Sequence, residues 1–199
     1  MNNVEEVLAV AGIQNAYTYS EYISMVESVV AEGRTTGPIQ SEDLSHYTKL
    51  NFSRSLRIYK TTKLADDIVT KVKAINRKQT WYVLTEGWCG DAAQSVPVIA
   101  LMAEENPLIT LKLILRDENL GIMDQFLTDG GRSIPKLIGI DENKNVLFTW
   151  GPRPQKAQEL YNAFKANPTK EYKAFSEDLQ RWYIKDKAVS IQEELGELL

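Results

Sequence analysis

Trp88-Cys89-Gly90-Asp91-Ala92 contains the only cysteine in a chain of 199 residues. An apolar run at residues 81–84 precedes this stretch, and an amphipathic helical pattern follows it. The sequence therefore predicts a thiol where a strand meets a helix N-terminus, whose partial positive charge favours the reactive thiolate. Because an alanine stands three residues after the cysteine, no internal disulfide can form here. Any redox cycle needs its second thiol from another molecule.

The composition is that of an ordinary globular protein in a reducing compartment. Hydrophobic residues make up 43% of the chain, enough for one substantial core plus an appendage. The N-terminus lacks a basic region followed by an apolar run, and no stretch approaches the ~18 consecutive apolar residues of a membrane span. We therefore expect a cytoplasmic location and no membrane partner. The net charge of −4 argues against nucleic acid as the main partner. With one cysteine and one histidine, we expect no metal site.

Charge is distributed unevenly along the chain. Residues 1–43 carry seven acidic side chains and one basic one, whereas residues 44–81 carry nine basic side chains and two acidic ones. The basic side chains of the second stretch recur at helical spacing, which favours a face that is solvated or paired with the acidic leader. An anionic partner for this face is the alternative. Its members are Lys49, Arg54, Arg57 and Lys60.

Two helices are predicted in the first third of the chain, at about 20–32 and 41–60. Serine residues suited to capping begin each of them, and Gly33 ends the first. His46, the only histidine, lies in the second helix. We interpret it as a surface or interface histidine, with a catalytic pair to Cys89 as the alternative.

From residue 64 onward the pattern alternates between helices and strands. After a helix at 64–76, the order is β-α-β-α-β-β-α, in which two parallel strands are followed by an antiparallel hairpin. This order predicts a four-stranded mixed sheet flanked by helices, with a reactive group beyond Leu84 at the carboxyl ends of the parallel strands. Cys89 lies at that edge. The predicted strands are 81–85, 109–115, 136–140 and 146–150, and the predicted helices are 92–105, 121–128 and 154–165.

The last thirty residues are predicted to be mostly helical. A helix at about 170–184 carries one broad apolar face, which must be covered. We expect the helices of the N-terminal extension to cover it, with a homodimer interface as the alternative. The tail at 190–199 is expected to fray or to add one helical turn. The broad face comprises Tyr172, Phe175, Leu179, Trp182 and Tyr183.

Several features together resemble the thioredoxin superfamily over about residues 64–166. Trp88-Cys89-Gly90 is similar to the start of the W-C-G-P-C motif, and Pro97 stands where a proline interrupts the helix after that motif. Ile134-Pro135 resembles the dipeptide that precedes the third core strand, and Gly151 fits after the last strand. Within the superfamily, the motif with a helical leader looks like a bacterial group called thioredoxin family proteins.

The resemblance implies a thioredoxin-like fold of the α/β class, to which the helical patterns on either side add an N-terminal extension and a C-terminal helix. The corresponding parts are 1–62, 63–166 and 167–199. It also implies a cis peptide bond before Pro135, which would face the cysteine and present backbone to an extended peptide. Trp88 lines the resulting cleft or packs against the sheet edge. The candidate site is thus Cys89 as nucleophile, with Trp88, Gly90, Asp91, Ile134 and Pro135 as cleft or support residues.

The departures from the family pattern bear on function. Ala92 replaces the second cysteine, Asp91 replaces the proline of the motif, and Val83 replaces the buried acid of the preceding strand. An ionised Asp91 near the sulfur would raise the pKa of the thiol. Alternatively, Asp91 is an acid in the first helical turn that stabilises the helix through its dipole.

Three functions remain open, and the sequence leaves undecided whether the chain is an enzyme. The first is a monothiol thiol-disulfide oxidoreductase that acts through a mixed disulfide on Cys89. The second is a redox-inactive thioredoxin-fold module that binds proteins. The third is a glutathione-linked monothiol protein, with or without an iron-sulfur cluster. The expected partners are a protein or a low-molecular-weight thiol or disulfide, and we expect no cofactor.

Overall fold

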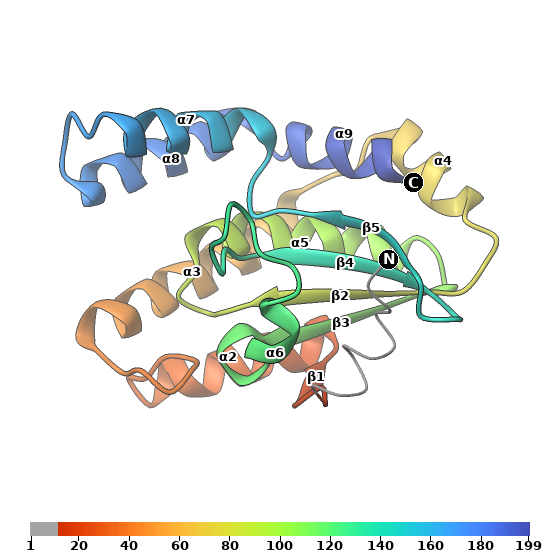
Figure 1. Ribbon diagram of the computed structural model, residues 1–199, viewed down its shortest axis with the longest axis horizontal. Helices are drawn as coiled ribbons and strands as arrows, with labels where there is room; N and C mark the ends of the chain where they lie inside the picture. Colours follow the sequence, from red (N-terminus) through yellow and green to blue (C-terminus); the bar gives the residue numbers. More distant parts are fainter. Residues whose placement is uncertain (1–11) are drawn as a thin grey trace.

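The computed structural model describes residues 12–199 and contains a five-stranded mixed sheet of order β1-β3-β2-β4-β5 (Figure 1). The central strand β2 runs parallel to β3 and antiparallel to β4, and β5 closes the hairpin with β4. The α/β class and the thioredoxin-like sheet predicted from the sequence are confirmed. The strands are β1 (Ala16–Tyr17), β2 (Gln79–Thr85), β3 (Ile109–Leu115), β4 (Lys136–Asp141) and β5 (Val146–Trp150).

Strand β2 is central because its side chains are apolar toward both faces of the sheet. Trp81, Val83 and Leu84 are almost completely buried. Such a continuous apolar run is typical of a strand covered on both sides. Because β2 and β3 are parallel, their carboxyl ends reach the same edge of the sheet, where Leu84 lies opposite Ile114. The Cys89 motif follows directly beyond this edge.

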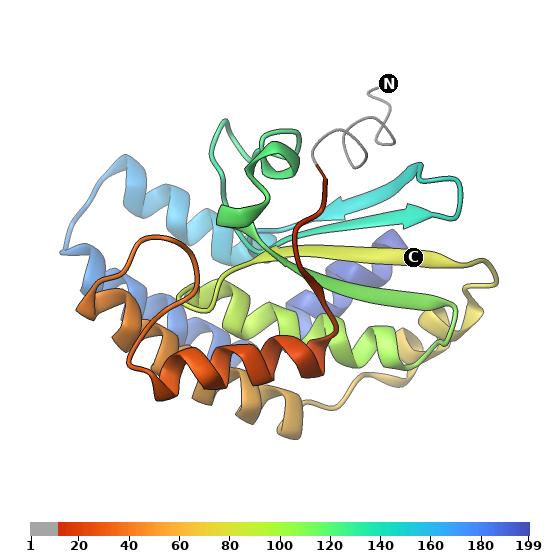
Figure 2. The same cartoon turned by 90° about the horizontal axis from the view of Figure 1, so that it is seen from below.

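Helices α2, α3 and α5 gather on one side of the sheet, and the short α6 lies on the other (Figure 2). The long helix α5 contains Pro97 and is buried along most of its length. It packs against α3 on the side away from the sheet. The helices are α2 (Tyr19–Ala31), α3 (Glu42–Thr61), α4 (Asp66–Ala74), α5 (Gly90–Glu104), α6 (Leu120–Met123), α7 (Gln155–Ala166), α8 (Tyr172–Asp186) and α9 (Val189–Leu198).

The fifth strand corrects the predicted count of four. Ala16 and Tyr17 pair antiparallel with Ile114 and Leu113 at the outer edge of β3. Two residues carry no alternation that could distinguish a strand from a loop, so only the pairing with β3 identifies β1. The helix predicted at 121–128 is also shorter than expected, because α6 ends at Met123.

The tail was wrongly predicted as a frayed end or a single turn. Residues 189–198 form the ten-residue helix α9, whose Ile191 and Leu195 are 1% and 2% exposed. This helix packs against α4 and α5. The Gln192 side chain accepts a hydrogen bond from the Ala65 amide at 2.8 Å, which fixes α9 to the start of α4. Burial of these apolar side chains supplies the stabilisation that a free tail lacks.

Helix α8 buries only part of its aromatic face. Phe175, Leu179 and Tyr183 are buried, whereas Tyr172 is 62% exposed. Phe175 stacks on Phe164 of α7 with ring centroids 4.2 Å apart. Helix α8 thus contacts α7, and its Gln180 and Tyr183 side chains reach α5. Within residues 12–199, no helix is long and apolar enough to cross a membrane.

Candidate functional site

Cys89 is the N-cap residue of α5 and is 8% exposed. Its sulfur accepts a hydrogen bond from the Ala92 amide at 3.4 Å, and its S–H donates to the Ile134 carbonyl at 3.3 Å. Burial, with a smaller contribution from the nearby Asp91 carboxylate, raises the pKa of the Cys89 thiol to about 12. The backbone N–H groups of the first turn oppose these effects but are outweighed. At neutral pH the thiol is therefore protonated.

The Ile134–Pro135 peptide bond is cis, as is Gly151–Pro152, and both Ile134 and Pro135 are buried. The Ile134 carbonyl that accepts from the thiol thus belongs to the residue before the proline. Gly151 lies against this segment with a φ of +112°. A Cβ atom there would approach the Pro135 carbonyl oxygen to 2.2 Å. Only glycine fits this position, and its contact fixes the backbone facing Cys89.

Asp91 connects α5 to two distant parts of the chain. Its carboxylate forms an ion pair with Arg153 at 2.8 Å and accepts a hydrogen bond from the Tyr183 hydroxyl at 2.9 Å. Burial raises the pKa of Asp91, and Arg153 partly counteracts this. The Arg153 guanidinium also lies 4.2 Å from the ring centroid of Tyr161. An acid in the first turn thus anchors α8 and the segment after β5 to the Cys89 motif.

Helices α2 and α3 lie against Cys89. Tyr22 and Val26 of α2 and Ser55 of α3 line a cavity beside the sulfur of about 10 Å³. Such a volume is at the lower limit for one water molecule, so it leaves no room for a substrate disulfide. The Ser55 hydroxyl faces the Ala93 carbonyl at 3.5 Å.

Helix α8 also lies against the motif. The Gln180 amide lies so close to Gly90 that a Cβ there would sit 3.1 Å from its nitrogen. Gln180 also accepts a hydrogen bond from the Gln94 side chain at 2.7 Å. Both glutamines are buried. Parts of the chain before and after the central sheet therefore cover the motif together.

Trp88 is half-buried, and the Arg116 guanidinium lies 4.8 Å from its ring centroid. This distance and the placement over the ring are those of a cation–π contact. The arginine comes from the turn after β3, which begins where that strand ends. The contact holds the tryptophan at the carboxyl edge of the sheet.

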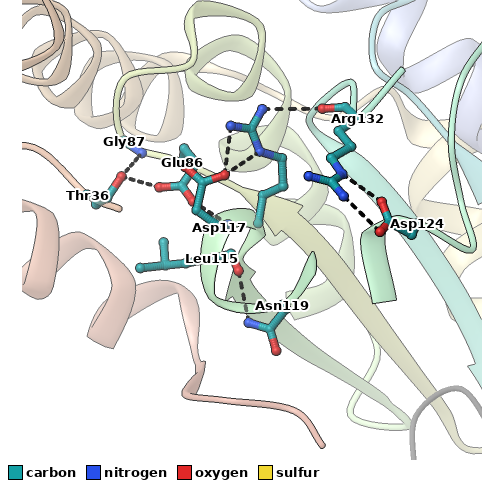
Figure 3. A network of polar contacts seen from close by, with 9 residues as sticks. Thr36, Glu86, Gly87, Leu115, Asp117, Asn119, Asp124 and Arg132 are labelled. Carbon is teal, nitrogen blue, oxygen red and sulfur yellow. Dashed lines mark hydrogen bonds and ion pairs between the residues drawn. The ribbon is translucent and has the colours of Figure 1, made fainter. Parts of the chain in front are cut away.

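A buried acid, Glu86, lies directly after β2 and is 1% exposed (Figure 3). Its carboxylate accepts hydrogen bonds from the Thr36 hydroxyl and, at 2.9 Å, from the Asp117 amide. The same hydroxyl accepts from the Gly87 amide at 2.9 Å. Burial raises the pKa of Glu86 to about 7, partly offset by these hydrogen bonds. The network joins the loop between α2 and α3 to the ends of both parallel strands.

The structure brings the predicted site residues Cys89, Asp91, Ile134 and Pro135 together, and Gly90 and Trp88 flank them. His46 is exposed on α3, where its ring meets that of Tyr47 edge-on. The sequence did not identify several residues that lie around the motif in the structure. The family pattern places the buried acid at the position of Val83, whereas Glu86 stands three residues later. The missed residues are Thr36, Glu86, Arg153 and Gln180.

Two solved structures share the fold, both below the identity at which function can be transferred. The crystal structure of an HIV epitope scaffold matches with 16% identity and a TM-score of 0.57, covering 92% of this chain and 97% of the other. A protein of unknown function from Pseudomonas aeruginosa matches with 20% identity and a TM-score of 0.52, covering 89% and 99%. No curated protein matches the sequence. A thioredoxin family model matches residues 37–173, more than two thirds of the chain, and the chain therefore belongs to the thioredoxin family.

Proposed function

We propose that this chain is a cytoplasmic thioredoxin-fold protein that binds other proteins and does not use Cys89 for thiol-disulfide exchange. The observation that carries the proposal is the buried thiol, which donates its hydrogen to the Ile134 carbonyl. Exchange requires a thiolate that can approach a disulfide along the S–S axis. Here the sulfur faces a cavity too small to admit one.

The protonation state supports the same proposal. With a pKa of about 12, only about one thiol in 10⁵ is ionised at pH 7. Reactive cysteines reach pKa values of about 3.5 to 7.5 through nearby cations. The cation that lowers the pKa of Cys89, Arg153, is instead paired with Asp91. Its charge is thus largely compensated before it can stabilise a thiolate.

The substitutions in the motif support a structural role for it. Asp91 stands where thioredoxins carry a proline, and its side chain binds Arg153 and Tyr183. Ala92 stands where thioredoxins carry the second cysteine and is 2% exposed. Both residues contribute to packing between α5 and its covering helices. The motif therefore stabilises the fold at the place where other family members perform chemistry.

Monothiol exchange is the second candidate, and the Ala92 amide at 3.4 Å from the sulfur favours it. In that reaction the Cys89 thiolate attacks one sulfur of a partner disulfide, a mixed disulfide forms, and the other sulfur leaves as a thiolate. A low-molecular-weight thiol then attacks the partner's sulfur and releases Cys89. The first step requires α2, α3 and α8 to move away from the sulfur.

Thiol titration with Ellman's reagent distinguishes the two candidates. We expect the native protein to react at least ~100-fold more slowly than the same protein in urea, because both burial and protonation suppress attack. We also expect no acceleration of insulin reduction by dithiothreitol. A native rate within tenfold of the unfolded rate, or catalysis of insulin reduction that Cys89→Ser abolishes, would overturn the proposal.

A further inference from the structure

From its second turn onward, the solvent-exposed side of α3 carries basic and apolar side chains, whereas the acidic Glu42 and Asp43 lie exposed in its first turn. The basic and apolar members of this side, which we call the α3 basic face, are His46, Lys49, Leu50, Leu56, Arg57 and Lys60. All of these side chains are exposed. In addition, Arg54 is half-buried at the margin of this face. From residue 45 to residue 61 the helix has no aspartate or glutamate.

The cations of this face are not used inside the described part of the chain. Seven ion pairs join residues within 12–199, and none includes a basic residue of α3. The interpretation of a face paired with the acidic leader is therefore not realised among these residues. Glu104 of α5 does reach α3, but it accepts a hydrogen bond from the Tyr59 hydroxyl at 2.6 Å. Arg54 donates to the neutral Asn51 side chain, and burial and Arg57 lower its pKa.

The exposed leucines add an apolar component. Leu50 and Leu56 are 37% and 42% exposed, whereas Ile58 of the same helix is 8% exposed. Six residues of helix separate them by about 9 Å along the axis. Single exposed leucines need no explanation, but two of them among cations form a mixed surface. Protein interfaces commonly combine apolar contacts with charges at their rim.

The back of α3 is firmly attached to the molecule. Asn51 donates to the Gly87 carbonyl at 3.3 Å, and the Thr48 hydroxyl lies 2.5 Å from that of Thr35. Helix α3 packs along α5 on the side away from the sheet (Figure 2). The side chains of its basic face are exposed. A partner on this face meets a rigid helix and leaves the cover over Cys89 in place.

We propose that the α3 basic face docks an acidic protein segment that also carries leucine-like side chains. Carboxylates of the partner would pair with Lys49, Arg57 and Lys60, and its apolar side chains would cover Leu50 and Leu56. Charge complementarity of this kind accelerates association and selects partners, and salt weakens it. This inference rests on the proposed function, because it names the surface through which that binding occurs.

The test uses the full chain and a fluorescein-labelled peptide of repeated Glu-Glu-Leu-Leu, with fluorescence anisotropy as the readout. The triple variant Lys49→Glu, Arg57→Glu, Lys60→Glu is expected to weaken binding at least ~10-fold at low salt. The matched control Lys156→Glu, Lys165→Glu, Lys173→Glu carries the same change in net charge on exposed positions of α7 and α8. It is expected to retain affinity within ~3-fold.

Two further variants test the contributions of the exposed leucines and of Cys89 to peptide binding. Leu50→Ser with Leu56→Ser is expected to weaken binding while leaving its salt dependence unchanged, because the cations remain. Cys89→Ala is expected to bind as the wild type does. Equal losses of peptide affinity in the two charge-reversal variants would overturn the proposal. Tighter binding of the full chain to phosphatidylserine vesicles or to single-stranded RNA than to the peptide would also overturn it. A reactive native thiol, by contrast, would overturn the proposed function and leave peptide binding unaffected.

Discussion

The Tyr183 hydroxyl donates a hydrogen bond to the Asp91 carboxylate at 2.9 Å, joining residues that are 92 positions apart in the chain. Together with Arg153, this contact makes Asp91 a buried and compensated charge. A carboxylate at the start of α5 thus binds the C-terminal part of the chain. The first prediction follows from this role.

Asp91→Asn should lower the free energy of unfolding by about 3 kcal/mol, because it leaves Arg153 buried without its counter-charge. Chemical denaturation by urea at pH 7 measures this change. The matched control is Asp124→Asn, which removes an exposed ion pair to Arg132 and should cost less than about 1 kcal/mol. Equal effects of the two substitutions would argue against a structural role of Asp91.

Glu86 should make stability depend on pH. Its pKa rises from the ordinary value of 4.5 to about 7 in the folded protein. A carboxyl group whose pKa is raised favours the folded state fully below pH 4.5 and loses this contribution as the pH rises through 7. The difference corresponds to about 3 kcal/mol. Urea midpoints at pH 5 and pH 8 should therefore differ less in Glu86→Gln than in the wild type. Glu142→Gln, on an exposed turn, serves as the control and should retain the wild-type difference.

Gly151→Ala should be strongly destabilising, by about 3 kcal/mol or more, because the new Cβ would meet the Pro135 carbonyl oxygen. Gly130→Ala is its matched control. Gly130 also has a positive φ, but no atom lies within 4 Å of an added Cβ. The Gly130→Ala substitution should therefore lower the free energy of unfolding only through backbone strain, by about 1 kcal/mol. Thermal unfolding of both variants measures the difference, and similar melting temperatures would exclude the contact as the cause.

Helix α9 should contribute to the core. Leu195→Ala, at a position 2% exposed, is expected to cost about 2 to 5 kcal/mol through lost burial and the cavity left behind. Leu198→Ala removes the same atoms at a position 40% exposed and should cost less than half as much. If the two losses of stability are equal in urea denaturation, α9 does not pack as described.

The sequence predicted those parts of the fold that local patterns determine. The apolar run of β2, the polar turn between β4 and β5, and the Cys89 junction each have a signal within ten residues. Helix α9 has no such local signal, because Ile191 and Leu195 form a narrow apolar stripe whose burial depends on α4. Strand β1 is too short for any periodicity. Pairing with a distant element decides the structure in both cases.

The position of the candidate site along the chain could be predicted from the sequence, but its environment could not. Trp88, Cys89 and Gly90 resemble a known motif, so their position could be inferred. The burial of the sulfur depends instead on side chains from α2, α3 and α8, which are far away in sequence. No local pattern connects Gln180 to Gly90 or Thr36 to Glu86. Long-range packing thus decided whether a recognisable motif has an accessible thiol.

The distance along the chain between Asp91 and Tyr183 also affects how the protein folds during its synthesis. At ~5 to 20 residues per second, the ribosome adds Tyr183 roughly 5 to 20 s after Asp91. Until then the Cys89 motif has its sheet and the N-terminal helices, but not the cover contributed by α8. A nascent chain arrested before residue 172 should therefore expose more of the motif than the finished protein does.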